Sequence, residues 1–222
     1  MRKVVTIDGP AGAGKSTVAR LLASRLGWRL LDTGAMYRAV TLAAIRAEID
    51  LANEDALGTL AEGLAVRLPP GEVLLNGEDV TGLIRTVEIT RASRYLADSP
   101  RVRAQLVRLQ REFARENEVV AEGRDQGTVV FPDAFRKFFL TATLAERARR
   151  RHAEFVLRGE AIELAAVERD LRERDERDAA RAIAPMKAAD DAHILDTTGL
   201  DLDAVVGRIE REIVGEPESD PS

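Results

Sequence analysis

The sequence predicts an α/β fold in which a parallel sheet is flanked by helices. Two observations predict it: short apolar runs alternate with helical patterns, and a glycine-rich motif lies directly after the first run. A short apolar run between such segments is typical of a strand that is buried on both faces. The five expected strands are Val4–Ile7, Arg29–Leu31, Val119–Ala121, Lys137–Leu140 and His193–Leu195.

The glycine-rich motif, GPAGAGKS over residues 9–16, fits G-x-x-x-x-G-K-[ST] in full, and it opens a helix expected over Lys15–Leu26. In such a P-loop the backbone N–H groups surround phosphate oxygens, and the helix N-terminus adds partial positive charge. Lys15 is expected to contact the β- and γ-phosphates, and the Ser16 hydroxyl to bind Mg²⁺. The motif therefore places the sheet in the P-loop NTPase fold. The expected donor-binding residues are Gly9, Pro10, Ala11, Gly12, Ala13, Gly14, Lys15, Ser16 and Thr17.

The remaining elements follow from periodicity and turn chemistry. A second helix is expected from Gly34 to about Arg46, and another begins at Pro100, because proline suits a first helical turn. An acidic start at Asp201 and Asp203 favours a helix over Leu202–Val214. Short strands at Ala65–Leu68, Val73–Leu75 and Glu78–Val80 form a small β-rich insertion, with a tight turn at Asn76-Gly77.

We expect a single domain with three parts, followed by a tail. The core takes residues 1–55, 99–145 and 182–214, and the insertion takes residues 56–98. Residues 146–181 are rich in arginine and acidic side chains, which predicts either a mobile helical lid or a solvated helical hairpin. Residues 215–222 are polar, carry two prolines and are expected to be a disordered tail.

Composition excludes several classes of protein. The chain has no cysteine, so disulfides and thiolate metal sites are absent, and its two histidines are far apart. A net charge of −5 and few aromatic residues argue against a dedicated nucleic-acid binder. No apolar run reaches the length of a membrane span, and no export signal is present. We therefore expect a cytoplasmic protein that binds neither membrane nor nucleic acid.

Three local groups predict an anion site at the carboxyl ends of the strands, where α/β sheets bind ligands. The first is Asp32–Arg38 and the second Glu122–Gly127. The third is Arg174, Asp178 and Arg181, whose spacing puts them on one helix face. Two guanidinium groups suit a phosphate, and a carboxylate suits a ribose diol. For the third group, charge pattern alone favours a salt-bridged solvent face, because i, i+4 pairs such as Glu168–Arg172 share this helix.

The combined motifs resemble the cytidylate kinase family of bacteria. The segments that carry the resemblance are TIDGPAGAGKST, LLDTGAMYR, EGRDQGTVVFPDA and ERDERDAARAIAP, and the likeness runs from about Val4 to Val214. The resemblance implies a nucleoside monophosphate kinase fold with a five-stranded parallel core, an acceptor-binding insertion and a lid. It implies transfer of the γ-phosphoryl group of ATP to CMP or dCMP, with Mg²⁺, by a monomer.

The resemblance also implies roles for individual residues. Arg38, Arg124 and Arg181 match arginines that bind the acceptor phosphate, and Thr33, Arg174 and Asp178 match positions near the ribose. Arg103 and Asp125 match residues that recognise the cytosine ring, and Tyr37 lies within the same acceptor motif. Arg150 and Arg151 are both candidates to approach the transferring phosphate. The implied catalytic set is Lys15, Arg124, Arg181, Arg150 and Arg151.

Two positions depart from the family pattern, and other functions stay open. Thr33 replaces a serine, and Arg94 lies where the family tends to place a small hydroxyl near the base. The alternative enzyme is another P-loop kinase, acting on UMP, dTMP or a metabolite hydroxyl. The alternative outside the kinases is a nucleotide-dependent switch with slow hydrolysis, although the chain has no N-K-x-D guanine-binding motif.

Overall fold

The computed structural model describes residues 2–157 and 159–214. The chain forms two compact units, which we describe separately. One contains Arg2 and Arg29–Glu118, and the other contains Lys3–Trp28 and the described residues from Val119 onward. The expected tail at residues 215–222 lies outside the described residues. No helix in the described part of the chain is long and apolar enough to cross a membrane.

A five-stranded sheet has the order β2-β6-β1-β7-β8. Its strands are β1 (Val4–Asp8), β2 (Arg29–Asp32), β6 (Val119–Glu122), β7 (Arg136–Thr141) and β8 (His193–Asp196). β1 pairs in parallel with β6 and with β7, and β7 pairs in parallel with β8. The prediction of a parallel sheet flanked by helices is confirmed, and each strand begins or ends within one residue of its expected position.

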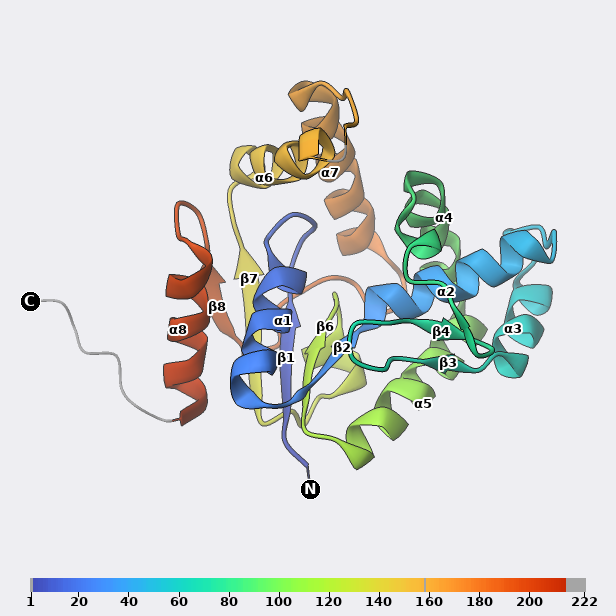
Figure 1. The fold of residues 1–222 in the computed structure, drawn as a ribbon, viewed down its shortest axis with the longest axis horizontal. Coiled ribbons are helices and arrows are strands. Elements are labelled where there is room, and N and C mark those ends of the chain that lie inside the picture. Colours follow the sequence, from blue (N-terminus) through green and yellow to red (C-terminus); the bar gives the residue numbers. More distant parts are fainter. Residues whose placement is uncertain (1, 158, 215–222) are drawn as a thin grey trace, which may run out of the picture. The chain divides into compact units, whose positions relative to one another are not determined.

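The unit that contains β1 is built around apolar strands covered by helices. Val5, Ile7, Val119 and Val120 are fully buried, as their continuous apolar runs predict. α1 (Lys15–Leu26) and α8 (Leu202–Val214) have the predicted bounds, and they pack against each other (Figure 1). Gly27 ends α1 with a left-handed conformation, the usual C-terminal cap.

Two helices follow β7 in the same unit. α6 (Leu144–Leu157) and α7 (Leu164–Ala180) pack together beyond the end of β7 (Figure 1). A small apolar cluster joins Ala148 of α6 to Val167 and Leu171 of α7, and it includes Ala11 of the P-loop. The arginine-rich segment is therefore helical as predicted, and one face of it is buried against the loop before α1.

The other unit holds β2, the small β-rich segment and the helices around it. Its helices are α2 (Thr33–Arg46), α3 (Glu54–Gly63), α4 (Val87–Asp98) and α5 (Pro100–Glu116), with a short 3-10 turn at Leu83–Arg85. β3 (Val66–Arg67), β4 (Leu74–Leu75) and β5 (Glu78–Asp79) form an antiparallel sheet. Asn76 and Gly77 both have positive φ, so the predicted tight turn is present.

Helix ends in this unit carry the side-chain caps that fix their bounds. The Asp32 carboxylate accepts from the Ala35 N–H at 2.7 Å, which starts α2 directly after β2. Ser99 caps α5, and Pro100 takes its first turn as predicted. A core of Ala39, Val80, Ile84 and neighbouring apolar residues joins α2 to the β-rich segment.

Candidate functional site

The P-loop joins β1 to α1 through three glycines with positive φ. Gly9, Gly12 and Gly14 have φ of 136°, 77° and 86°. Gly9 also lies against the neighbouring strand, because a Cβ built on it would be 2.0 Å from the Leu140 carbonyl oxygen. Only glycine satisfies both conditions, so the motif's first glycine is required by packing as well as by backbone conformation.

Gly9→Ala is expected to lower the free energy of unfolding by at least about 3 kcal/mol, because it adds a backbone clash to an unfavourable φ. Gly27→Ala is the matched control. Gly27 has φ of 67° and open space where a Cβ would lie, so that variant carries only the left-handed penalty of about 1–2 kcal/mol. Urea denaturation of both variants measures the difference. Equal losses would show that the contact with Leu140 has no energetic consequence.

The Lys15 side chain is buried and turns back toward the P-loop. Lys15 is only 5% exposed, and its Nζ donates a hydrogen bond to the Pro10 carbonyl at 2.7 Å. Burial, and next the positive charge of Arg124, lower the pKa of Lys15 well below its usual value. An ammonium group that is disfavoured by burial and by a neighbouring arginine favours binding of a polyanion, because phosphate oxygens would stabilise its charge.

Ser16 contacts the end of β6. Its hydroxyl donates to Glu122 Oε1 at 2.6 Å, and Glu122 is itself buried. A hydroxyl beside a carboxylate is a hard-oxygen donor set of the kind that Mg²⁺ uses when nucleotide phosphates provide its other ligands. The described residues contain no group of three His, Cys, Asp or Glu side chains that could hold a metal ion.

Asp8 lies behind the P-loop, at the end of β1, and is almost fully buried. Its carboxylate accepts from the backbone N–H of Gln126 at 2.9 Å and of Gly127 at 2.7 Å. Burial raises the pKa of Asp8 to about 6, against the lowering effect of these two hydrogen bonds. Asp8 thereby connects the P-loop strand to the π-helical turn Gln126–Val130 that follows Glu122–Asp125.

The raised pKa predicts a pH-dependent stability. Because folded Asp8 holds its proton more tightly than the unfolded chain does, this contribution is fully present below the ordinary value of 3.8 and is lost as the pH rises through about 6. Compared with Asp8→Asn, the wild type should lose about 2 kcal/mol of unfolding free energy between about pH 4 and pH 8. Urea titrations at both pH values measure this difference. Parallel pH profiles would refute the assigned pKa.

A cationic cluster lies on α7 and the loop after β6. Asp178, only 4% exposed, bonds to Arg124 Nε at 3.0 Å and pairs with Arg181 at 2.8 Å. Burial alone would raise the pKa of Asp178, but Arg124, Arg181 and Arg174 outweigh it and lower the pKa. One carboxylate among three arginines leaves an excess of positive charge. This arrangement distinguishes the cluster from the exposed Glu168–Arg172 pair on the same helix.

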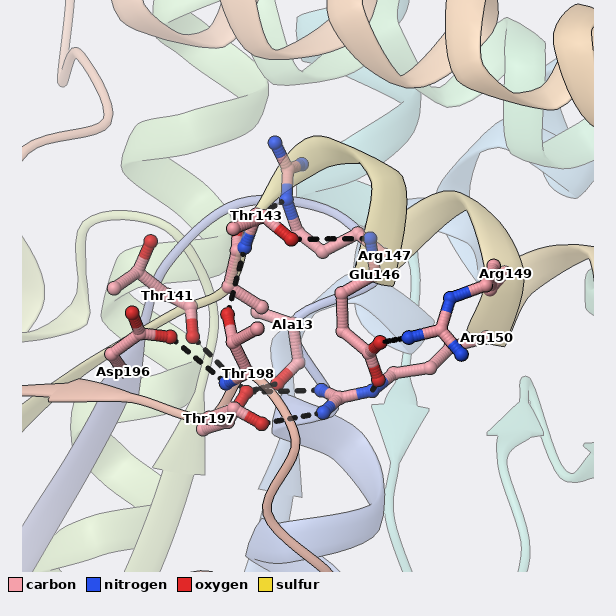
Figure 2. Close-up of polar contacts among 11 residues, drawn as sticks. Ala13, Thr141, Thr143, Glu146, Arg147, Arg149, Arg150, Asp196, Thr197 and Thr198 are labelled. Atoms are coloured by element: carbon pink, nitrogen blue, oxygen red, sulfur yellow. Dashed lines mark hydrogen bonds and ion pairs between the residues drawn. The ribbon is translucent and has the colours of Figure 1, made fainter.

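The two candidate lid arginines differ in their surroundings. Arg150 donates from Nη1 to the Thr197 hydroxyl at 2.9 Å and from Nη2 to the Thr197 carbonyl at 2.6 Å. Its Nε donates to Glu146 at 2.8 Å, as Figure 2 shows. Arg151 instead pairs with Glu154 at 2.6 Å and lies over the Phe155 ring. Arg150 is thus fixed to the loop after β8, whereas the partners of Arg151 belong to its own helix.

The other unit contains the predicted acceptor residues Thr33, Tyr37, Arg38 and Arg103, whereas Asp125 is buried beside Arg124 in the unit that contains β1. Arg38 pairs with Asp32 at 3.5 Å, and its Nη1 lies close to Gly34 at the start of α2. Among the described residues, the buried Arg38 Nε has no hydrogen-bond partner. Thr33 is buried in the same turn. A guanidinium group beside a helix N-terminus favours an anion.

Arg103 and Tyr37 lie together in this unit. Arg103 is buried, and its Nη1 donates to the Tyr37 hydroxyl at 3.3 Å. Arg94, the position that departs from the family pattern, donates to the Tyr95 hydroxyl at 3.0 Å and lies over that exposed ring. The Arg94 guanidinium therefore has a partner on its own helix.

Sequence reasoning missed four polar residues around the P-loop. Asp8 was signalled only as an acidic residue that directly ends an apolar strand, and Thr197 had no distinctive signal. Arg147 and Asp175 belong to charged stretches in which similar residues surround them, so the sequence did not single them out. Thr17, predicted in the donor set, is exposed on the first turn of α1.

A family model and curated relatives both match this chain along most of its length, and both are described as cytidylate kinase. The family model described as cytidylate kinase matches residues 5–214. A cytidylate kinase of Pseudomonas aeruginosa is 48% identical over 214 residues, covering 94% of this chain and 93% of that protein. A cytidylate kinase of Azotobacter vinelandii is 49% identical over 216 residues, covering 95% and 94%. An uncharacterized protein from Eubacterium ventriosum has a TM-score of 0.54 at 12% identity, covering 97% of this chain and 100% of that chain, which supports the fold alone.

Proposed function

The chain belongs to the cytidylate kinase family, and we propose that it transfers the γ-phosphoryl group of ATP to CMP or dCMP, producing ADP and CDP or dCDP. The observation that carries the proposal is the family match over residues 5–214 together with a complete P-loop. The cluster of Arg124 and Arg181 around the buried Asp178 supports it, because a monophosphate acceptor needs a cationic site.

On the donor side, the P-loop amides and Lys15 would bind the phosphates of ATP. Enzymes that transfer phosphoryl groups act mainly by positioning both substrates and by neutralising charge. Ser16, with Glu122 beside it, would hold Mg²⁺, and the ion would offset the negative charge of the ATP phosphates. Lys15 would exchange its bond to the Pro10 carbonyl for phosphate oxygens.

On the acceptor side, Arg38, Arg124 and Arg181 would bind the phosphate of CMP. Thr33, Arg174 and Asp178 would contact the ribose, while Arg103 and Asp125, with Tyr37 beside Arg103, would recognise the base. The acceptor is already a phosphate anion at neutral pH, so the reaction needs no general base. In this scheme Asp178 orients two phosphate-binding arginines and also accepts hydrogen bonds from the ribose hydroxyls.

We propose that residues 56–98 form the acceptor-binding insertion and residues 146–181 the lid. Within the lid, Arg151 would have to give up its pair with Glu154 and its place over the Phe155 ring to contact a phosphate. Arg150 would have to leave Thr197 and Glu146. Both stay in the proposed catalytic set, with Arg151 as the residue that needs less rearrangement. We also expect the protein to be cytoplasmic. We expect it to be a monomer, which sedimentation of the purified enzyme checks.

An acceptor panel tests the proposal. ADP release is measured by a coupled assay with ATP, Mg²⁺ and, separately, CMP, dCMP, UMP, AMP, GMP and dTMP. We expect strong turnover with CMP and dCMP and little without an acceptor. Preference for UMP, dTMP or a non-phosphorylated hydroxyl would favour the alternative, another P-loop small-molecule kinase. Equal ADP release with and without acceptor would favour a nucleotide-dependent switch.

A further inference from the structure

A single ion pair holds both peptide groups of Ala11 in the P-loop. The Ala11 N–H donates to Asp175 Oδ1 at 3.3 Å, and the Ala11 carbonyl accepts from Arg147 Nη1 at 3.0 Å. Arg147 Nη1 also bonds to Asp175 Oδ2. Asp175 belongs to α7 and Arg147 to α6. The loop is therefore clamped from the helical hairpin that follows β7.

The Arg147 side chain is buried and held by several contacts, unlike a surface arginine. Its side chain is 8% exposed, and Nε donates to the Ala142 carbonyl at 3.1 Å. The backbone of Gly12 lies against it, since a Cβ on Gly12 would be 3.0 Å from Arg147 Cβ. In Figure 2 Arg147 and Arg150 emerge from the same helix, and Arg150 bonds to Thr197, whose hydroxyl lies 3.5 Å from the Ala13 carbonyl.

The charge arrangement gives the pair a specific consequence for phosphate binding. A carboxylate at a P-loop N–H would repel a triphosphate if its charge were not compensated. Arg147 provides that compensation and also holds the Ala11 carbonyl, which must turn away so that loop N–H groups can face phosphate oxygens. Pairing thus allows Asp175 to orient the loop without the cost of an unpaired negative charge.

We infer that Arg147 and Asp175 are positioning residues for the donor nucleotide: they fix the Ala11 peptide groups of the P-loop and so set the affinity for ATP. Neither residue is assigned to either substrate in the proposed mechanism. The inference rests on the proposed function only in taking the P-loop ligand to be ATP. It also links the proposed lid to the donor site, because α6 and α7 each supply one member of the pair.

The test compares Asp175→Ala, Asp175→Asn and the double variant Arg147→Met/Asp175→Ala with the wild type. Asp175→Ala should raise KM for ATP and weaken ATP binding by calorimetry on the order of tenfold, because small misplacements of a binding loop are costly. KM for CMP should change less than about twofold. Asp175→Asn should recover part of the loss, since its amide oxygen can still accept from Ala11. Glu168→Gln is the control, because Glu168 also pairs with an arginine on α7 but both are exposed.

The double variant separates positioning from simple stabilisation. Removing both charges avoids an unpaired buried charge, so its thermal midpoint should recover relative to Asp175→Ala. We expect ATP affinity to stay low in spite of that recovery. ATP affinity that returns together with thermal stability, or that is unchanged in Asp175→Ala, would overturn the inference. Lack of CMP-dependent turnover in the wild type would instead defeat the proposed function, and calorimetric ATP binding would still test the positioning role.

Discussion

Lys15→Ala is expected to lower phosphoryl transfer by at least 10²–10³-fold, the usual cost of removing one preorganised charge from a transition-state site. The fold should stay intact. Lys15 is buried, and its charge is disfavoured there. Among the described contacts its ammonium group donates one hydrogen bond, to the Pro10 carbonyl, so the substitution removes little that stabilises the fold. Turnover is measured with ATP, Mg²⁺ and CMP, and folding by circular dichroism and thermal unfolding.

The chain offers a closely matched control in Lys137. It is also buried, and its Nζ also donates to the carbonyl of a proline five residues earlier, Pro132, with Asp191 as a second partner. Lys137→Ala should therefore lose stability but keep most of its activity when it is assayed well below its thermal midpoint. Activity close to wild type in Lys15→Ala would sink the assignment of the P-loop as the donor site.

Arg124→Ala is expected to lower kcat/KM for CMP on the order of 10²–10³-fold. It removes one phosphate-binding cation and one of the partners that hold Asp178, so the local charge becomes less positive where the acceptor phosphate is expected to bind. ATP binding measured by calorimetry should change much less. The resulting split between acceptor and donor parameters is the signature of an acceptor residue.

Arg136→Ala is the control for this variant. Arg136 is a partly buried arginine at the start of β7 whose guanidinium donates to the backbone carbonyls of Glu212 and Phe135. Its loss should affect stability without changing KM for CMP. A CMP parameter that is unchanged in Arg124→Ala, or reduced equally in both variants, would remove Arg124 from the acceptor site.

Much of the fold could be predicted because local signals agree with the tertiary structure. The strands at Val4 and Val119 are continuous apolar runs, and both are buried in the sheet. The bounds of α1 follow from a motif that requires a helix at Lys15 and from a glycine at its end. Asn76-Gly77 likewise defined the turn between β4 and β5, because positive φ at both positions suits these two residues.

The site could be predicted only in part, because its charged residues act in groups that the sequence does not distinguish. Asp175 and Asp178 belong to one charged helix, yet one bonds to the P-loop and the other to Arg124. Arg150 and Arg151 are adjacent, yet only Arg150 bonds to Thr197, 47 residues away. Which partner a charged side chain finds depends on long-range packing, as does the π-helical turn after Asp125.

The most direct test of the central claim follows the labelled phosphoryl group itself. ATP that carries a γ-phosphate label is incubated with the enzyme, Mg²⁺ and CMP, and the products are separated by chromatography. We predict that the label moves into CDP, and that little label is released as inorganic phosphate whether or not CMP is present. Label that accumulates only in inorganic phosphate, with none in CDP, would contradict the account.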